Sequence, residues 1–177
     1  MTTLRAIRIW LVIFIVALVL SGLTAFPLET ELRIGSSVLH STPLAGGMPQ
    51  LTEWIDRVRD ALIATNERYP FLAYGTDWLA FAHLVIAVAF IGVLRDPVRN
   101  VWIIVWGMIA CVGIIPLALI AGPIRGIPWG WTLIDCSFGV IGIIPLLIVY
   151  RLIRRLERER AVAGLAAQPA GISSSST

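Results

Sequence analysis

The sequence predicts an all-α integral membrane protein, with four transmembrane helices in an antiparallel bundle and an extracytoplasmic amphipathic helix between spans 1 and 2. Hydrophobic residues make up 58% of the 177 residues and charged residues only 14%, whereas soluble domains have about 45–50% and 25%. The excess lies in four apolar runs of about 17–20 residues, the length a helix needs to cross a bilayer. Residues 1–155 are therefore expected to form a single four-span membrane domain.

The first span is expected at about residues 9–26. Arg5 and Arg8 precede it, a pattern that also occurs in secretory signal peptides. The apolar run is long for a signal peptide, and Leu23-Thr24-Ala25 is a poor cleavage site. We therefore favour an uncleaved transmembrane helix.

Residues 27–73 form the longest polar stretch and are expected to be an outer loop containing one helix at about 50–66. Turn-forming residues occur at 35–37 and 44–49. Beyond them, Pro49 suits the first turn of a helix, and apolar residues recur at helical spacing: Leu51, Trp54, Ile55, Val58 and Leu62. This helix is expected to pack on its own bundle, with the lipid surface or a partner as alternatives.

Three further spans are expected at about residues 78–94, 101–120 and 131–150. Asp96 followed by Pro97 resembles a helix start, and Thr132-x-x-Asp135 has the spacing of a capping box. Both connections between these spans are short, which favours antiparallel neighbours. Residues 156–177 are expected to be a cytoplasmic tail, disordered towards its end because it is rich in Ala, Gly, Pro and Ser.

Arginine placement predicts the orientation, because short cytoplasmic segments are enriched in basic residues. With the N-terminus inside, the inner segments hold Arg5, Arg8, Arg95, Arg99, Arg151, Arg154, Arg155, Arg158 and Arg160. Outside, Arg33, Arg57, Arg59 and Arg68 lie in the long loop, and Arg125 is alone in a short segment. Both termini are therefore expected to be cytoplasmic, in a bacterial inner membrane.

His83 is the polar residue in the spans that is hardest to explain by helix ends. Ionisable groups within a span are costly and often functional, and Asp135 falls at a similar depth. We hypothesise that His83 and Asp135 form a hydrogen bond across the bundle. The candidate polar cluster in the outer third of the membrane is completed by Asp77, Arg125 and Glu29. Asp77 by itself is explained as a first-turn carboxylate.

A second polar group is the inner turn of Arg95, Asp96, Arg99 and Asn100, which helix capping and inside retention explain. The segment Gly113–Leu117 recurs as Gly142–Leu146. We interpret this as two local proline kinks rather than as an inverted repeat of the transporter type. Small residues that allow close helix contact are Gly107, Ala110, Gly113, Gly139 and Gly142.

The sequence carries no motif that names a substrate. It has no H-E-x-x-H, no Gly-rich phosphate loop and no C-x-x-C, so no catalytic, cofactor-binding or metal-binding residue is predicted. The net charge of +3 gives no indication of a nucleic-acid partner. The leading hypothesis is a non-catalytic accessory, assembly or interaction subunit, with the lipid bilayer and other membrane subunits or a second copy as partners. A small dimeric transporter or proton-linked carrier with an outward-facing pocket at His83 and Asp135 is the alternative, followed by a membrane enzyme or redox protein.

Overall fold

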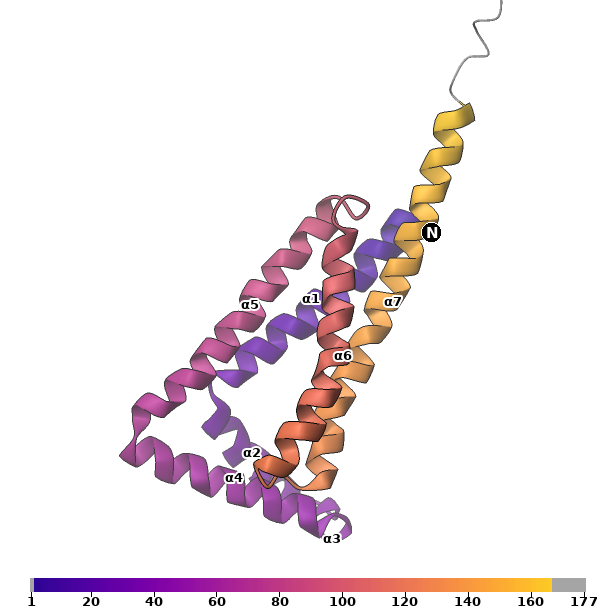
Figure 1. The fold of residues 1–177 in the computed structure, drawn as a ribbon. Coiled ribbons are helices and arrows are strands. Elements are labelled where there is room, and N and C mark those ends of the chain that lie inside the picture. Colours follow the sequence, from indigo (N-terminus) through magenta and orange to yellow (C-terminus); the bar gives the residue numbers. More distant parts are fainter. Residues whose placement is uncertain (1, 167–177) are drawn as a thin grey trace, which may run out of the picture.

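The structure is a computed structural model that describes residues 2–166. Within this range every regular element is a helix. In chain order these are α1 (Thr3–Ala25), α2 (Leu28–His40), α3 (Leu44–Gly47), α4 (Pro49–Arg68), the 3-10 helix η1 (Pro70–Ala73), α5 (Tyr74–Arg95), α6 (Val101–Ile124) and α7 (Trp129–Ala166) (Figure 1).

Four of these helices are long and apolar enough to span a membrane: α1, α5 together with η1, α6 and α7. The prediction of an all-helical chain with four such segments is therefore confirmed. The helices extend beyond the apolar runs, most of all α7, which continues through the arginine-rich segment to Ala166. The end of the tail, where disorder was predicted, lies outside the described residues.

The four long helices do not pack equally along their lengths. Helix α1 packs against both α5 and α7, and α6 packs along α7. Helices α5 and α6 meet near the turn that joins them and then diverge, while α4 crosses the opposite end of the molecule (Figure 1). We call these two ends the turn end and the α4 end.

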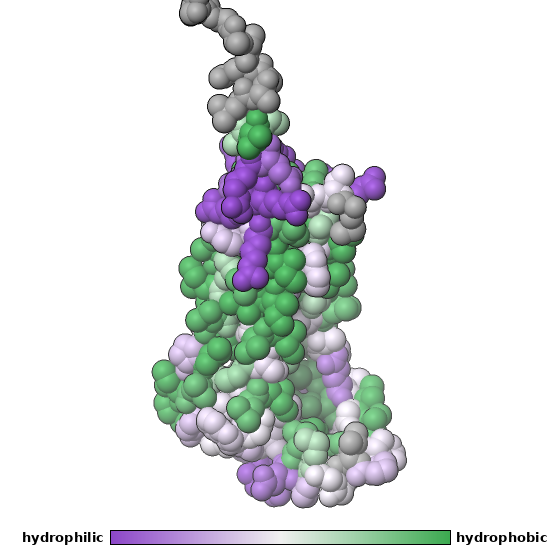
Figure 2. Space-filling view, turned by 90° about the vertical axis from the view of Figure 1, so that its right-hand side faces the viewer, coloured by the Kyte–Doolittle hydropathy of each residue, from purple (hydrophilic) through white to green (hydrophobic). Residues whose placement is uncertain are grey.

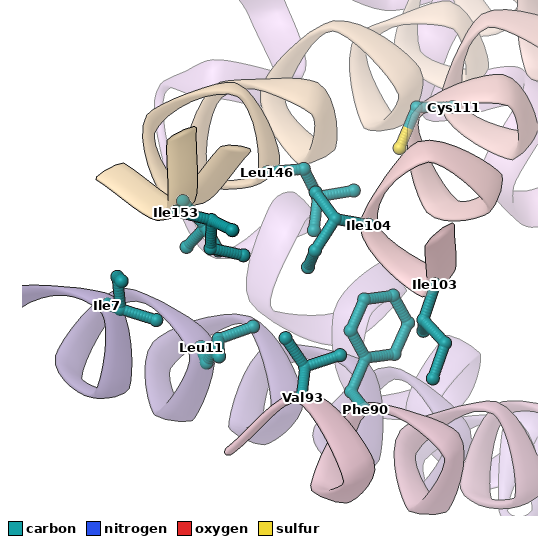
Figure 3. Packing of buried hydrophobic residues seen from close by; sticks show 10 residues of the cluster. Ile7, Leu11, Phe90, Val93, Ile103, Ile104, Cys111, Leu146 and Ile153 are labelled. Atoms are coloured by element: carbon teal, nitrogen blue, oxygen red, sulfur yellow. The ribbon is translucent and has the colours of Figure 1, made fainter. Parts of the chain in front are cut away.

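The buried apolar core lies towards the turn end, where all four long helices meet (Figure 3). Phe90 of α5 is buried in this core, and its ring centroid lies 4.9 Å from that of Phe14. The other buried members of the core are Ile7, Leu11, Val93, Ile103, Ile104, Cys111, Leu146, Val149 and Ile153.

Glycines bring the helices close together at three of the five predicted small-residue positions. A Cβ atom at Gly107 would lie 2.9 Å from Phe90 Cζ, and one at Gly142 would lie 3.2 Å from Cys111 Sγ. At Gly139 it would overlap the backbone carbonyl oxygen of Cys111. Only a residue without a side chain permits this approach of α6 to α7. Gly113, by contrast, has open space around it.

The connection between α6 and α7 is a Schellman turn. Gly126 adopts a φ of 67°, its N–H donates to Pro123 O, and the Ile127 N–H donates to Gly122 O at 2.9 Å. Glycine is favoured here because it reaches positive φ without steric cost. The turn sends the chain directly back along α6.

The polar layer, which we define as α2, α3 and α4, corrects the sequence interpretation. Residues 28–40 were expected to be loop, with a turn at 35–37, but they form α2. Its Glu29 and Arg33 form an i,i+4 ion pair at 2.8 Å, which supports a helix. Helix α4 begins at Pro49, in the range where an amphipathic helix was expected.

The surface between the two ends is predominantly apolar. Figure 2 shows a broad hydrophobic region in the middle of the molecule and hydrophilic groups towards both ends. Large apolar side chains such as Val88, Ile109, Ile120 and Ile141 are more than half exposed. Apolar area of this extent is what a lipid-facing surface requires.

Candidate functional site

His83 forms its hydrogen bond within its own helix. Its Nδ1 atom donates to the Leu79 carbonyl oxygen at 2.8 Å, one turn earlier in α5. The residue also packs closely on α1, because a Cβ atom added at Gly22 would lie 2.9 Å from His83 Cβ. A local partner for the imidazole therefore exists, which the sequence interpretation had not considered.

Asp135 lies in the second turn of α7 rather than at its start. Helix α7 begins at Trp129, and Thr132 donates its hydroxyl proton to the Pro128 carbonyl oxygen instead of capping the helix. The capping-box interpretation of Thr132 and Asp135 is therefore wrong. Thr132 is buried beside Gly122, so its place is set by contact between α6 and α7.

The hydrogen bond predicted between His83 and Asp135 is absent from the described part of the chain. The physical reason is the divergence of α5 from α6 and α7 towards the α4 end (Figure 1). His83 lies in the first half of α5 and Asp135 in the second turn of α7. Asp135 precedes the buried Leu146 by three helical turns, so it shares the core-facing side of α7. At that level, however, α5 no longer lies close by.

The remaining members of the predicted cluster form no hydrogen bond or ion pair with one another within residues 2–166. Asp77 lies in the first turn of α5, as expected, and Arg125 is exposed at the end of α6. Glu29 belongs to the polar layer, where it accepts a hydrogen bond from Asn66 Nδ2 at 2.7 Å and pairs with Arg33. The Asn66 hydrogen bond and then the one from Arg33 hold the pKa of Glu29 below its ordinary value.

The most densely connected polar group is a network between α2 and α4, formed by Ser36, His40, Asp56 and Arg59. Asp56 accepts hydrogen bonds from Ser36 Oγ at 2.6 Å and from His40 Nε2 at 2.8 Å. Arg59 donates to Asp56 at 2.9 Å and also to Ser36 Oγ. The Ser36 hydrogen bond, followed by that of His40, lowers the pKa of Asp56. The network thus joins two helices through one ionised carboxylate.

The hydrogen-bond partners of Ser36 and His40 show the role of this network. A serine nucleophile needs its hydroxyl bonded to an imidazole that acts as a base. Here the Ser36 hydroxyl and the His40 imidazole both donate to Asp56, so the carboxylate lies between them. Ser36 is only 1% exposed. The arrangement fixes α2 on α4 and is not that of an activated nucleophile.

Sequence reasoning missed this network because it did not predict α2. Residues 29, 33, 36 and 40 are polar and follow each other at intervals of three and four, which places them on one helix face. That spacing was the available signal. The turn-forming character of Gly35-Ser36-Ser37 outweighed it.

Besides a small cavity of about 190 Å³ beside Arg57, two larger cavities lie at the α4 end. One of about 400 Å³ is mainly apolar and lies between the start of α4 and the start of α7, beside Trp54 and Trp131. The other, of about 340 Å³, lies where α1 and α2 join and includes Glu29, Asn66 and Thr76.

The predicted polar turn at residues 95–100 forms a compact hydrogen-bonded connection. Asp96 Oδ1 accepts from the Arg99 N–H at 3.2 Å, and Asn100 Nδ2 donates to the Gly92 and Asp96 carbonyl oxygens. Helix α6 starts at Val101, after Asn100, so Pro97 is not its first helical residue. The side chains of the turn thus provide hydrogen-bond partners for backbone groups at the end of α5.

Among residues 2–166, no three His, Cys, Asp or Glu side chains gather as metal ligands. Cys111 and Cys136 are both free thiols. Comparison of the chain with models of known protein families, with curated proteins and with solved structures finds no match. The functional argument therefore rests on the geometry of this chain.

Proposed function

We propose that this protein is a non-catalytic accessory, assembly or interaction subunit in a membrane. The observation that carries the proposal is the divergence of α5 and α6, which leaves apolar helix faces that no helix within residues 2–166 covers. These faces are available to a transmembrane helix of a partner.

The uncovered face of α6 follows from residues seven apart, which lie on nearly the same side of a helix. Ile103 faces α5 near the turn and is 6% exposed. Ala110 is exposed one heptad further on, and Leu117, after two heptads, is 67% exposed. This side of α6 is therefore buried near the turn and becomes exposed to its surroundings towards the α4 end.

The facing side of α5 shows the same change. Gly92 lies beside Asn100 of the turn and Ile103 of α6. Val85 and Trp78, one and two heptads before it, are 50% and 57% exposed. Because helix association in lipid depends on van der Waals contact, a partner helix packed between these faces would gain contacts that the chain alone does not make.

The membrane placement is part of the proposal. The four spans form an antiparallel bundle in a bacterial inner membrane, with both termini cytoplasmic and the polar layer outside. Nine of the fourteen arginines then lie at the cytoplasmic end, as in other membrane proteins. The transporter alternative depended on a pocket at His83 and Asp135, and no specific observation favours it.

Site-specific photocrosslinking in native membranes tests the proposal. A photoreactive residue at Leu117 is expected to form a discrete adduct with one membrane protein that also co-purifies in fixed stoichiometry. The matched control is Ile144 of α7, which is 50% exposed but lies two residues from buried Leu146 and so points away from the core. Lipid adducts alone at Leu117, or identical adducts at both positions, would contradict the proposal.

The orientation is tested separately by labelling single cysteines with a membrane-impermeant maleimide, in a variant that lacks Cys111 and Cys136. A cysteine replacing exposed Arg57 in α4 is expected to react from outside the intact cell, and one replacing Arg160 only after lysis. The reverse pattern would overturn the orientation without affecting the partner argument.

A further inference from the structure

The last part of α7 carries four arginines on one face: Arg151, Arg154, Arg155 and Arg158. Their spacing of i, i+3, i+4 and i+7 places them within one side of the helix, and all four are exposed. We call this face the arginine stripe. It lies on the part of α7 that runs beside the start of α1 (Figure 1), in the region where Figure 2 shows a hydrophilic group near the end of α7.

The stripe faces away from the bundle because the opposite side of α7 is packed. Ile153 is fully buried in the core with Ile7 and Leu11 of α1, and Leu156 packs against the same cluster. Thr3 Oγ1 donates to Glu159 at 3.3 Å, so α1 contacts α7 as far as this residue. The stripe is therefore held in a defined direction.

The carboxylates beside the stripe neutralise only half of it. Arg154 pairs with Glu157 at 2.9 Å and Arg155 with Glu159 at 2.8 Å. Arg151 and Arg158 have no carboxylate partner in the described part of the chain, and Arg158 Nε donates only to the Arg154 carbonyl oxygen. Two guanidinium groups thus remain available to an external anion.

The position of the stripe along α7 indicates which anion. Tyr150 ends the apolar run, and at a rise of about 1.5 Å per residue Arg151, Arg154 and Arg155 lie within about 8 Å of it. The headgroup layer on each side of the hydrocarbon is roughly 5–7 Å thick. The Arg154 guanidinium also lies 5.2 Å from the centre of the Tyr150 ring, which suits the interface.

We propose that the arginine stripe binds the phosphate groups of anionic phospholipids in the cytoplasmic leaflet. The proposal rests on the membrane placement given above. Guanidinium groups match phosphate oxygens in pairs, and three of the four lie at phosphate depth. An acidic protein is less suited, because it would have to displace headgroups to reach Arg151.

The test uses the full chain in lipid nanodiscs that contain equal amounts of zwitterionic and anionic phospholipid. Native mass spectrometry then measures the ratio of the two lipids that remain bound. The wild-type chain is expected to retain the anionic lipid preferentially. R151Q/R158Q is expected to lower this enrichment about fivefold or more, since each arginine near the surface raises the affinity for anionic lipid by about fivefold.

Three variants make the test specific. R151K/R158K keeps the charge but loses the paired guanidinium donors, so it should retain only part of the enrichment, whereas E157Q/E159Q frees Arg154 and Arg155 and should raise it. The matched control, R57Q/R68Q in α4, should leave it unchanged. A wild-type lipid ratio equal to that of the nanodisc, or equal values for R151Q/R158Q and the control, would overturn the inference. So would loss of a co-purifying acidic protein from R151Q/R158Q with bound lipid unaltered.

Failure of the proposed membrane placement is distinguishable from failure of the stripe. A chain that does not enter nanodiscs of any composition contradicts both proposals. A chain that inserts fully but shows no anionic enrichment contradicts the stripe alone.

Discussion

The polar layer and the turn end of the bundle hold their helices together by different means. In the polar layer, α2 lies on α4 through hydrogen bonds that converge on Asp56. At the turn end, α6 lies on α7 through glycines that admit backbone contact, and the core contains only apolar side chains and a thiol. The first arrangement depends on charge and the second on shape.

The two kinds of packing are effective in different surroundings, one in lipid and the other near water. Backbone-to-backbone packing is effective in hydrocarbon, where the hydrophobic effect does not drive helices together. A carboxylate with several donors is effective where water competes only partly, because each retained hydrogen bond avoids an unsatisfied group. The two regions are thus expected to fail under different perturbations.

The largest effect is expected from Gly139→Ala at the contact between α6 and α7. The added Cβ would overlap the Cys111 carbonyl oxygen, and such overpacking costs about 1–3 kcal/mol or more. Unfolding in a denaturing detergent measures the loss. The control is Gly113→Ala, where the added atom meets open space and higher helix propensity is expected to stabilise by up to about 1 kcal/mol. Equal effects at both positions would refute the close contact.

An intermediate effect is expected from Ser36→Ala in the polar layer. The change leaves Asp56 and Arg59, whose side chains are both partly exposed, each without one hydrogen bond, and the loss of a hydrogen bond costs about 0.5–1.5 kcal/mol. Amide hydrogen exchange should become faster in α2 and remain unchanged in α6 and α7. Ser37→Ala, at the exposed neighbouring position, serves as control. Faster exchange throughout the chain would mean that the two regions are not independent.

A smaller, graded loss of stability in the polar layer is expected when the pH is lowered. The pKa values of Asp56 and Glu29 are lowered in the folded protein, so their stabilising contributions are present above the unfolded pKa values of about 4. The contributions are lost as pH falls through the lower folded values. Protease cleavage of α2 should therefore increase below about pH 4, with the spans intact. A polar layer equally resistant at pH 3 and pH 7 would contradict the role assigned to Asp56.

The sequence predicted the spans better than it predicted the contacts. Hydropathy over a whole run identified four helices long and apolar enough to span a membrane, because insertion into lipid depends on composition rather than on neighbours. The proposed contact between His83 and Asp135 failed because equal depth does not imply proximity when helices diverge. The capping box failed because Thr132 is placed by Gly122 of another helix, a contact that local spacing does not contain.

The sequence by itself determined the all-helical class, the four segments able to cross a membrane and the concentration of arginine at one end. These properties are sums over local residues, so no partner segment is needed to infer them. Only the tertiary structure decided that α2 docks on α4 through Asp56, that α5 and α6 separate from Gly92 towards the α4 end, and that the arginine stripe faces outward. Each of these depends on the angle at which distant helices meet, and that angle is set by the packing of particular side chains.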